Sequence, residues 1–331
     1  MSVIRPDLPL IDLHRHLDGS VRLETILEVG LQHDLPLPAR DLVGLRPYVQ
    51  VTTPQPDILA FFAKFEWQVG ILVNYDVCRR VAYENMQDAQ REGIDYIELR
   101  FSPWFMAEPH GLNPAGVVEA VAAGQRDFGV QANLIGIISG TYGPEVGQQE
   151  LDALLTQRDH LVALDLAGDE KNFPGEWFVD HFRQGREAGW QVTVHAGEAG
   201  GSQSIWQAIR ELGATRIGHA VRAVDDPALM DYLAQNRIGV ETNLTSNVQT
   251  STVPGYASHP LKTMLEHGIL ATINTDDPGI SAIDLPFEYE VAVEKAGLSE
   301  KQAAQAQQNA LDIAFLSTAE KEALRVKKQA H

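Results

Sequence analysis

Cysteine is almost absent from the sequence, since Cys78 is the only one among 331 residues. A single thiol cannot form a disulfide within the chain, which fits a protein of a reducing compartment. The N-terminal segment MSVIRPDLPL lacks the basic and then apolar stretches of a secretory signal. No window approaches the ~18 consecutive apolar residues of a membrane span. We therefore expect a cytoplasmic protein.

Positive charge is also scarce. The chain carries 26 Lys and Arg residues against 45 Asp and Glu residues, which gives a formal net charge of −19. This excess repels nucleic-acid backbones and anionic membranes but not a neutral small molecule, which is the expected partner. Ser/Gly linkers, repeats and low-complexity segments are missing as well, so we expect residues 1–331 to form a single domain.

Short apolar runs rich in Ile, Val and Leu recur along the chain, and each is followed by a longer amphipathic segment. These runs are typical of buried parallel strands; they are 9–14, 94–101, 131–139, 160–168, 190–195, 215–219, 237–243 and 269–276. Eight β-then-α units predict an α/β fold, a (β/α)8 TIM-type barrel. A doubly wound open sheet is the alternative, but no Gly-x-Gly-x-x-Gly follows the first strand.

Two segments do not fit a simple barrel repeat. Residues 22–92 are too long for one crossover, so we expect two or three extra helices inserted after strand 1 over the barrel mouth. Four apolar residues of this insertion share one helix face, which suits either core packing or a lid over substrate; they are Ile58, Phe61, Phe62 and Phe65. The tail 299–331 predicts a charged, Ala-rich helix on a solvated surface.

Polar residues close five of the predicted strands. His14 and His16 alternate along strand 1, so their side chains project to the same side. In a barrel the carboxyl ends of all strands meet at one mouth, where such enzymes keep their chemistry. One divalent cation would satisfy four of these polar groups at once, with His14, His16, His195 and Asp276 as ligands. Three imidazoles and one carboxylate suit Zn²⁺ best, with Fe or Co as alternatives.

Several motifs, in order along most of the chain, resemble those of the bacterial-type adenosine deaminase family in the metal-dependent amidohydrolase superfamily. They are IDLHRHLDGS (11–20), ELRFSP (98–103), LDLAGDE (164–170), TVHAGEA (193–199), RIGHA (216–220), LTSN (244–247) and INTDDP (273–278). The resemblance implies the zinc-dependent, hydrolytic deamination of adenosine and 2'-deoxyadenosine to inosine and 2'-deoxyinosine, with release of ammonia, in purine salvage. It also implies one Zn²⁺ per chain, held by the four ligands named above.

The resemblance further implies a role for individual residues. Glu198 protonates purine N1 as hydroxide attacks C6, and His219 orients the attacking water and assists its deprotonation. Asp277 contacts purine N7 and the attacking hydroxyl. The remaining substrate contacts are those of His16, Asp18 with the ribose 5'-hydroxyl, and the Gly168 amide with N3. A proton donor at N1 makes physical sense, because attack at C6 places electron density there.

Three positions depart from what the family leads us to expect. Gly140 stands where bacterial relatives tend to carry Arg, Asn243 where Cys is common, and Ala220 where Gly usually follows the histidine. The methyl group of Ala220 predicts a negative φ at that position. The alternatives that stay open are a deaminase of adenine or of an aminodeoxyfutalosine-type nucleoside, and a non-catalytic purine-nucleoside-binding protein.

Overall fold

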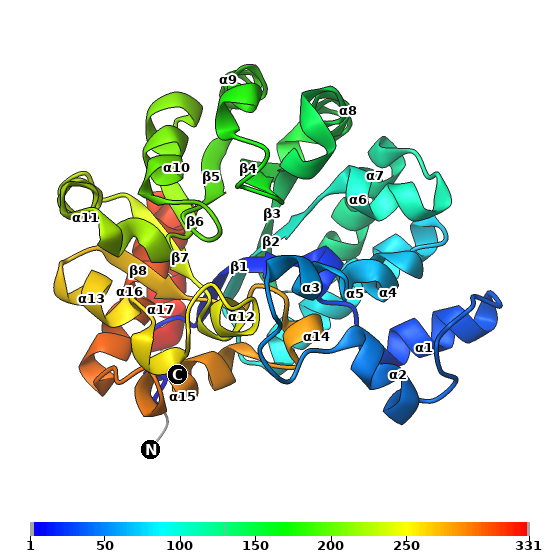
Figure 1. Ribbon diagram of the computed structural model, residues 1–331, viewed down its shortest axis with the longest axis horizontal. Coiled ribbons are helices and arrows are strands. Elements are labelled where there is room, and N and C mark those ends of the chain that lie inside the picture. The colour runs from blue at the N-terminus through cyan, green and yellow to red at the C-terminus, as the bar shows by residue number, and fades with distance from the viewer. Residues whose placement is uncertain (1–2, 129, 330–331) are drawn as a thin grey trace.

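Eight parallel strands form a barrel, which confirms the predicted fold class (Figure 1). The computed structural model describes residues 3–128 and 130–329. The strands pair in sequence order; they are β1 (Ile11–His16), β2 (Tyr96–Phe101), β3 (Gln131–Ser139), β4 (Leu161–Ala167), β5 (Gln191–Ala196), β6 (Arg216–His219), β7 (Gly239–Thr242) and β8 (Leu270–Ile273). Each lies within two or three residues of a predicted apolar run. The helices form one outer layer around the barrel, as the fold requires.

Backbone hydrogen bonds beyond the end of β8 close the barrel against β1. The amide of His16 donates to the carbonyl of Asp276 at 2.8 Å, and the amide of Asp276 donates to the carbonyl of His14 at 2.7 Å. Three of the predicted metal ligands are thus fixed by the closure itself.

Helices occupy the connections between the strands. They are α1 (Leu23–Gln32), α2 (Leu42–Val49), α3 (Ile58–Phe62), α4 (Phe65–Gly70), α5 (Tyr75–Arg91), α6 (Pro103–Ala107), α7 (Pro114–Arg126), α8 (Gly143–Leu155), α9 (Val179–Glu187), α10 (Ser202–Gln207), α11 (Pro227–Gln235), α12 (Leu244–Gln249), α13 (Leu261–Glu266), α14 (Pro278–Ser281), α15 (Leu285–Glu294), α16 (Glu300–Ile313) and α17 (Thr318–Gln329). None of those described is long and apolar enough to cross a membrane.

The segment between β1 and β2 holds five helices, α1 to α5, so the expectation of two or three was too low. The aromatic stripe also lies on two short helices, because the chain breaks between α3 and α4. Phe61 packs in a small apolar cluster with Val51 and Ile280, while Phe62 and Phe65 border the barrel mouth. The stripe therefore packs as a small apolar cluster that also borders the mouth, and its role as a lid over substrate stays a prediction.

The C-terminal segment forms two helices, and the expectation of a solvated helix holds for α17, in which only Leu324 is buried, but is wrong for α16, which is part of the core. Helix α16 packs on β8 and β1, and its residues Ala310 and Leu311 are buried with Ile11 and Leu13 of the first strand. Alanine lets the helix approach the closing strands closely. Helix α17 adds Leu324 to the same cluster.

Candidate active site

The four predicted metal ligands converge at the mouth of the barrel. His14 and His16 come from β1, His195 from β5 and Asp276 from the end of β8, and one donor atom of each lies within 4.8 Å of all the others. The Nε2 atom of His16 is 3.1 Å from Nε2 of His195 and 3.3 Å from Nε2 of His14. Ring nitrogens that face each other at these distances could bind one shared cation, and three imidazoles with one carboxylate suit a tetrahedral Zn²⁺ site.

Two buried carboxylates orient the histidine rings. Glu241 of β7 lies 2.7 Å from Nδ1 of His14, and Asp165 of β4 lies 3.1 Å from Nδ1 of His195. Such contacts hold the ring hydrogen on Nδ1 and leave Nε2 free to bind a cation. Arg100 donates to both carboxylates, at 2.8 Å to Asp165 and 2.7 Å to Glu241. The sequence analysis missed all three; the signal it offered was charge inside otherwise apolar strands.

The backbone at the mouth takes unusual conformations. His219, Ala220 and Asp276 have φ values of 62°, 53° and 64°, in the left-handed region that disfavours side chains. The expectation of a negative φ at Ala220 was therefore wrong. The amide of Ala220 donates to the carbonyls of Ala196 and Gly218, and this tight turn after β6 holds the residue in place in spite of its methyl group.

Two glycines make room for site residues. A Cβ atom on Gly19 would lie 1.8 Å from Oδ1 of Asp277, so only glycine leaves space for that carboxyl group. A Cβ atom on Gly218 would lie 2.9 Å from the ring of His14. The motifs HLDGS and RIGHA thus contain glycine for steric reasons as well as conformational ones.

Glu198 lies in a turn after β5 and is mostly shielded from water. Burial, and next the nearby charge of Asp276, raise the pKa of Glu198 to about 8. The turn is held by Glu170, whose carboxylate accepts hydrogen bonds from the backbone amides of residues 197–200. A carboxylic acid that keeps its proton at neutral pH is suited to act as a general acid.

His219 and Asp277 flank the four ligands on the other side. Nε2 of His219 is 3.8 Å from Oδ2 of Asp276, and burial lowers its pKa well below the usual value, so the ring is neutral. Asp277 is buried, and burial together with the charge of Asp276 raises its pKa well above the usual value. Its Oδ1 packs against Gly19 and finds no hydrogen-bond partner among residues 3–128 and 130–329.

Asp18 and Gly168 line a cavity of about 200 Å³ next to the four ligands. A smaller cavity of about 60 Å³ continues from it to Glu198, His219 and Asp277. Four aromatic residues line the larger of these cavities, two from the insertion and two from the segments after β2 and β3; they are Phe62, Phe65, Phe105 and Tyr142. Gly168 has a φ of 112°, and a Cβ atom there would lie 2.4 Å from Oγ1 of Thr141. Every residue predicted for the site is thus brought to one place.

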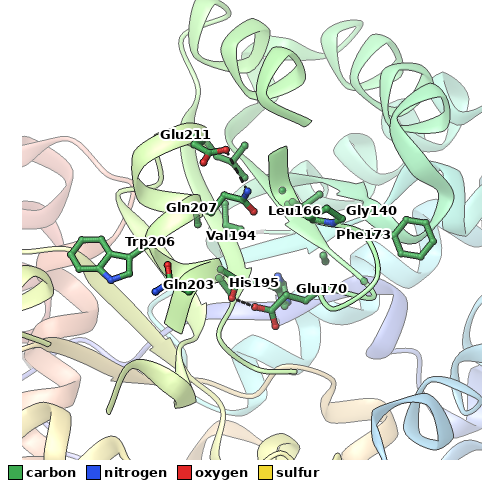
Figure 2. A pocket seen from close by; sticks show the side chains of 18 of the residues that line it. Gly140, Leu166, Glu170, Phe173, Val194, His195, Gln203, Trp206, Gln207 and Glu211 are labelled. Carbon is green, nitrogen blue, oxygen red and sulfur yellow. Dashed lines mark hydrogen bonds between the residues drawn. The ribbon is translucent and has the colours of Figure 1, made fainter. Parts of the chain in front are cut away.

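A third cavity, of about 340 Å³, lies behind the ends of β4 and β5, as Figure 2 shows. Gly140, Glu170 and His195 border it together with Gln207 and Glu211 (Figure 2). It does not include His14, His16 or Asp276, so we place the chemistry in the two smaller cavities. Gly140 therefore departs from the family pattern beside the site rather than within it.

Fold and site together define a metal-dependent hydrolase on a (β/α)8 barrel. The family profile for adenosine deaminase matches residues 9–329. Adenosine deaminase of Vibrio cholerae is 60% identical over 329 residues, 98% of each chain, and that of Salmonella typhimurium is 60% identical over 324 residues, 97% of each chain. The crystal structure of adenine deaminase from Arthrobacter aurescens has a TM-score of 0.89 at 25% identity over 98% of each chain. The chain belongs to the adenosine deaminase family.

Proposed function

We propose that the protein catalyses the hydrolytic deamination of adenosine and 2'-deoxyadenosine, with release of ammonia, as a step in purine salvage. The observation that most strongly supports this function is that His14, His16, His195 and Asp276 converge beside Glu198, which is buried and keeps its proton. Relatives at 60% identity, all called adenosine deaminase, favour the nucleoside over adenine. The same reasoning disfavours a non-catalytic binding protein, because a binder needs neither the ligand set nor the acid.

The metal is proposed to be one Zn²⁺ per chain, held by the three histidines and Asp276. Held by these residues, a Zn²⁺ ion would lower the pKa of a water molecule from 15.7 to about 7 and so would supply hydroxide at neutral pH. Glu241 and Asp165 support this assignment, because they direct Nε2 of His14 and His195 toward one point. Oxygen-rich coordination, which Mg²⁺ and Ca²⁺ prefer, is not offered here.

The chain's own residues carry the rest of the reaction. Glu198 donates its proton to purine N1 as C6 is attacked, so that negative charge does not build up on the ring. His219 orients the attacking water and assists its deprotonation, and Asp277, which borders the small cavity, contacts the attacking hydroxyl and N7. His16 borders the same cavity and contacts the substrate from the side of the ligands.

The ribose and the free edge of the purine meet the outer part of the site. Asp18 accepts a hydrogen bond from the amide of Ser102 at 3.1 Å and keeps a second oxygen for the 5'-hydroxyl. The Gly168 amide meets N3. The described residues that line the two cavities include no Lys or Arg, which supports a nucleoside without a 5'-phosphate. Phe62 and Phe65 exclude water above the base.

We also infer that all 331 residues form one catalytic domain, with residues 22–92 as a helical insertion, and that the protein works in the cytoplasm. The single cysteine, Cys78, is buried, and burial raises the pKa of its thiol to about 12, so it is inert in a reducing compartment.

The test is ammonia release from four substrates by the metal-loaded protein: adenosine, 2'-deoxyadenosine, adenine and aminodeoxyfutalosine. We expect turnover of the first two. Turnover of adenine alone would refute the assignment, because adenine has no ribose for Asp18 to hold.

A further inference from the structure

A buried row of side chains lies behind Glu198 and His219, on the side away from the metal ligands. Asn247 belongs to α12 and is fully buried, and His259, just before α13, is 4% exposed. Neither was predicted as part of the site. Nδ2 of Asn247 is 2.9 Å from Nδ1 of His219 and 3.2 Å from Oε1 of Glu198, so one amide group touches both.

His259 determines which way the Asn247 amide faces. The backbone amide of Leu261 donates to Nδ1 of His259 at 3.2 Å, so that nitrogen carries no hydrogen. Burial lowers the pKa of His259 to about 3, and the ring is therefore neutral with its hydrogen on Nε2. Nε2 lies 3.2 Å from Oδ1 of Asn247 and donates to it. The NH₂ group of Asn247 must then face Glu198 and His219.

The backbone of Asn247 is held as firmly as its side chain. Its carbonyl accepts hydrogen bonds from the amide of Val253 at 3.0 Å and from Oγ1 of Thr252 at 3.1 Å. Asn243, four residues earlier, also lies beside this ring, with its Nδ2 3.3 Å from Nδ1 and 3.5 Å from Nε2 of His219. Because His259 orients only the Asn247 amide, the N–H group of Asn247 is the donor that faces Nδ1. Two N–H groups cannot donate to each other, so Nδ1 of His219 must be the acceptor.

We propose that Asn247 and His259 are positioning residues that fix the tautomer of His219, with its hydrogen on Nε2 and an unprotonated Nδ1. Nε2 is the nitrogen that faces Asp276 and the metal ligands. With its hydrogen on Nε2, His219 donates a hydrogen bond to the oxygen of the attacking water and so orients it, and His219 does not itself accept a proton from that water. The same amide holds Glu198 through Oε1, leaving Oε2 for the proton. The role of His219 in deamination rests on the proposed function, whereas its tautomer does not.

The tautomer is tested directly by NMR of the zinc-loaded protein with ¹⁵N-labelled histidine rings, with His219 assigned by its loss in His219→Gln. We expect a protonated Nε2 and an unprotonated Nδ1. Asn247→Asp replaces the donor by an acceptor and should move the hydrogen to Nδ1. A wild-type His219 that carries its hydrogen on Nδ1 overturns the proposal, whether or not the protein deaminates adenosine.

Kinetics of two variants at His259 give the second test. His259→Phe removes the donor to Asn247 and should lower kcat about 10-fold, with KM and zinc content unchanged. His259→Gln keeps an N–H in the same place and should retain kcat within about 3-fold. An unchanged kcat in His259→Phe, or a loss that only follows the loss of zinc, contradicts the proposal. Absence of wild-type ammonia release from adenosine would instead refute the proposed function.

Discussion

Replacing Glu198 by glutamine tests the general acid most specifically. The pKa of Glu198 is raised from its ordinary value of 4.5 to about 8 by burial and by the charge of Asp276. At pH 7 about nine in ten molecules therefore carry the proton that purine N1 needs. Glutamine has nearly the same shape and can still accept from Asn247, but it cannot release a proton. We expect kcat to fall by at least ~10²-fold with the zinc content unchanged.

The pH profile carries the same prediction further. Because the proton is needed, kcat/KM of the wild type should fall as pH rises through about 8. In Glu198→Gln the residual activity should lack this fall. The assay is ammonia release from adenosine between pH 6 and about 9.5, with metal analysis of every sample. Near-wild-type turnover in the variant, or an unaltered alkaline limb, would refute the reasoning.

The remaining predictions concern stability, metal and substrate. In the metal-free protein, the raised pKa of Glu198 lowers the free energy of unfolding as pH rises from 4.5 to about 8, by up to about 5 kcal/mol. Calorimetry should therefore show that Glu198→Gln melts at a higher temperature than wild type, and the difference should grow toward pH 8. Asp276→Ala should lose zinc; full occupancy by elemental analysis would count against it as a ligand. Gly19→Ala should displace the Asp277 carboxyl and lower kcat at least ~10²-fold while zinc stays bound; wild-type turnover would show the displacement to be harmless. Adenosine 5'-monophosphate should react at least ~10³-fold less efficiently than adenosine, since the described residues that line the two cavities include no Lys or Arg to pair with its phosphate; comparable kcat/KM values would contradict this.

The barrel and the members of its site could be predicted because both depend on local patterns. Continuous apolar runs mark strands buried on both faces, and the fold rule then brings residues as distant as His14 and Asp276 to one mouth. Their chemical roles came from the family resemblance, since the spacing of the motifs alone indicates only a metal site.

What the sequence did not yield depends on contacts across the fold. Asp165 and Glu241 act through ring nitrogens on other strands, and Asn247 is oriented by a histidine twelve residues further on. The positive φ of Ala220 is imposed by the turn after β6, against the preference of the residue itself. The break between α3 and α4 is another case, because a stripe with helical spacing does not reveal where a helix stops.

The central claim is that distant histidines and acids meet around one zinc ion that serves adenosine deamination. It is tested most directly by measuring zinc per chain and ammonia release from adenosine on the same sample, before and after chelation. We predict about one zinc per chain, as a three-histidine, one-carboxylate site implies, and activity that disappears and returns with the metal. Full activity in protein shown to be free of metal would contradict the account.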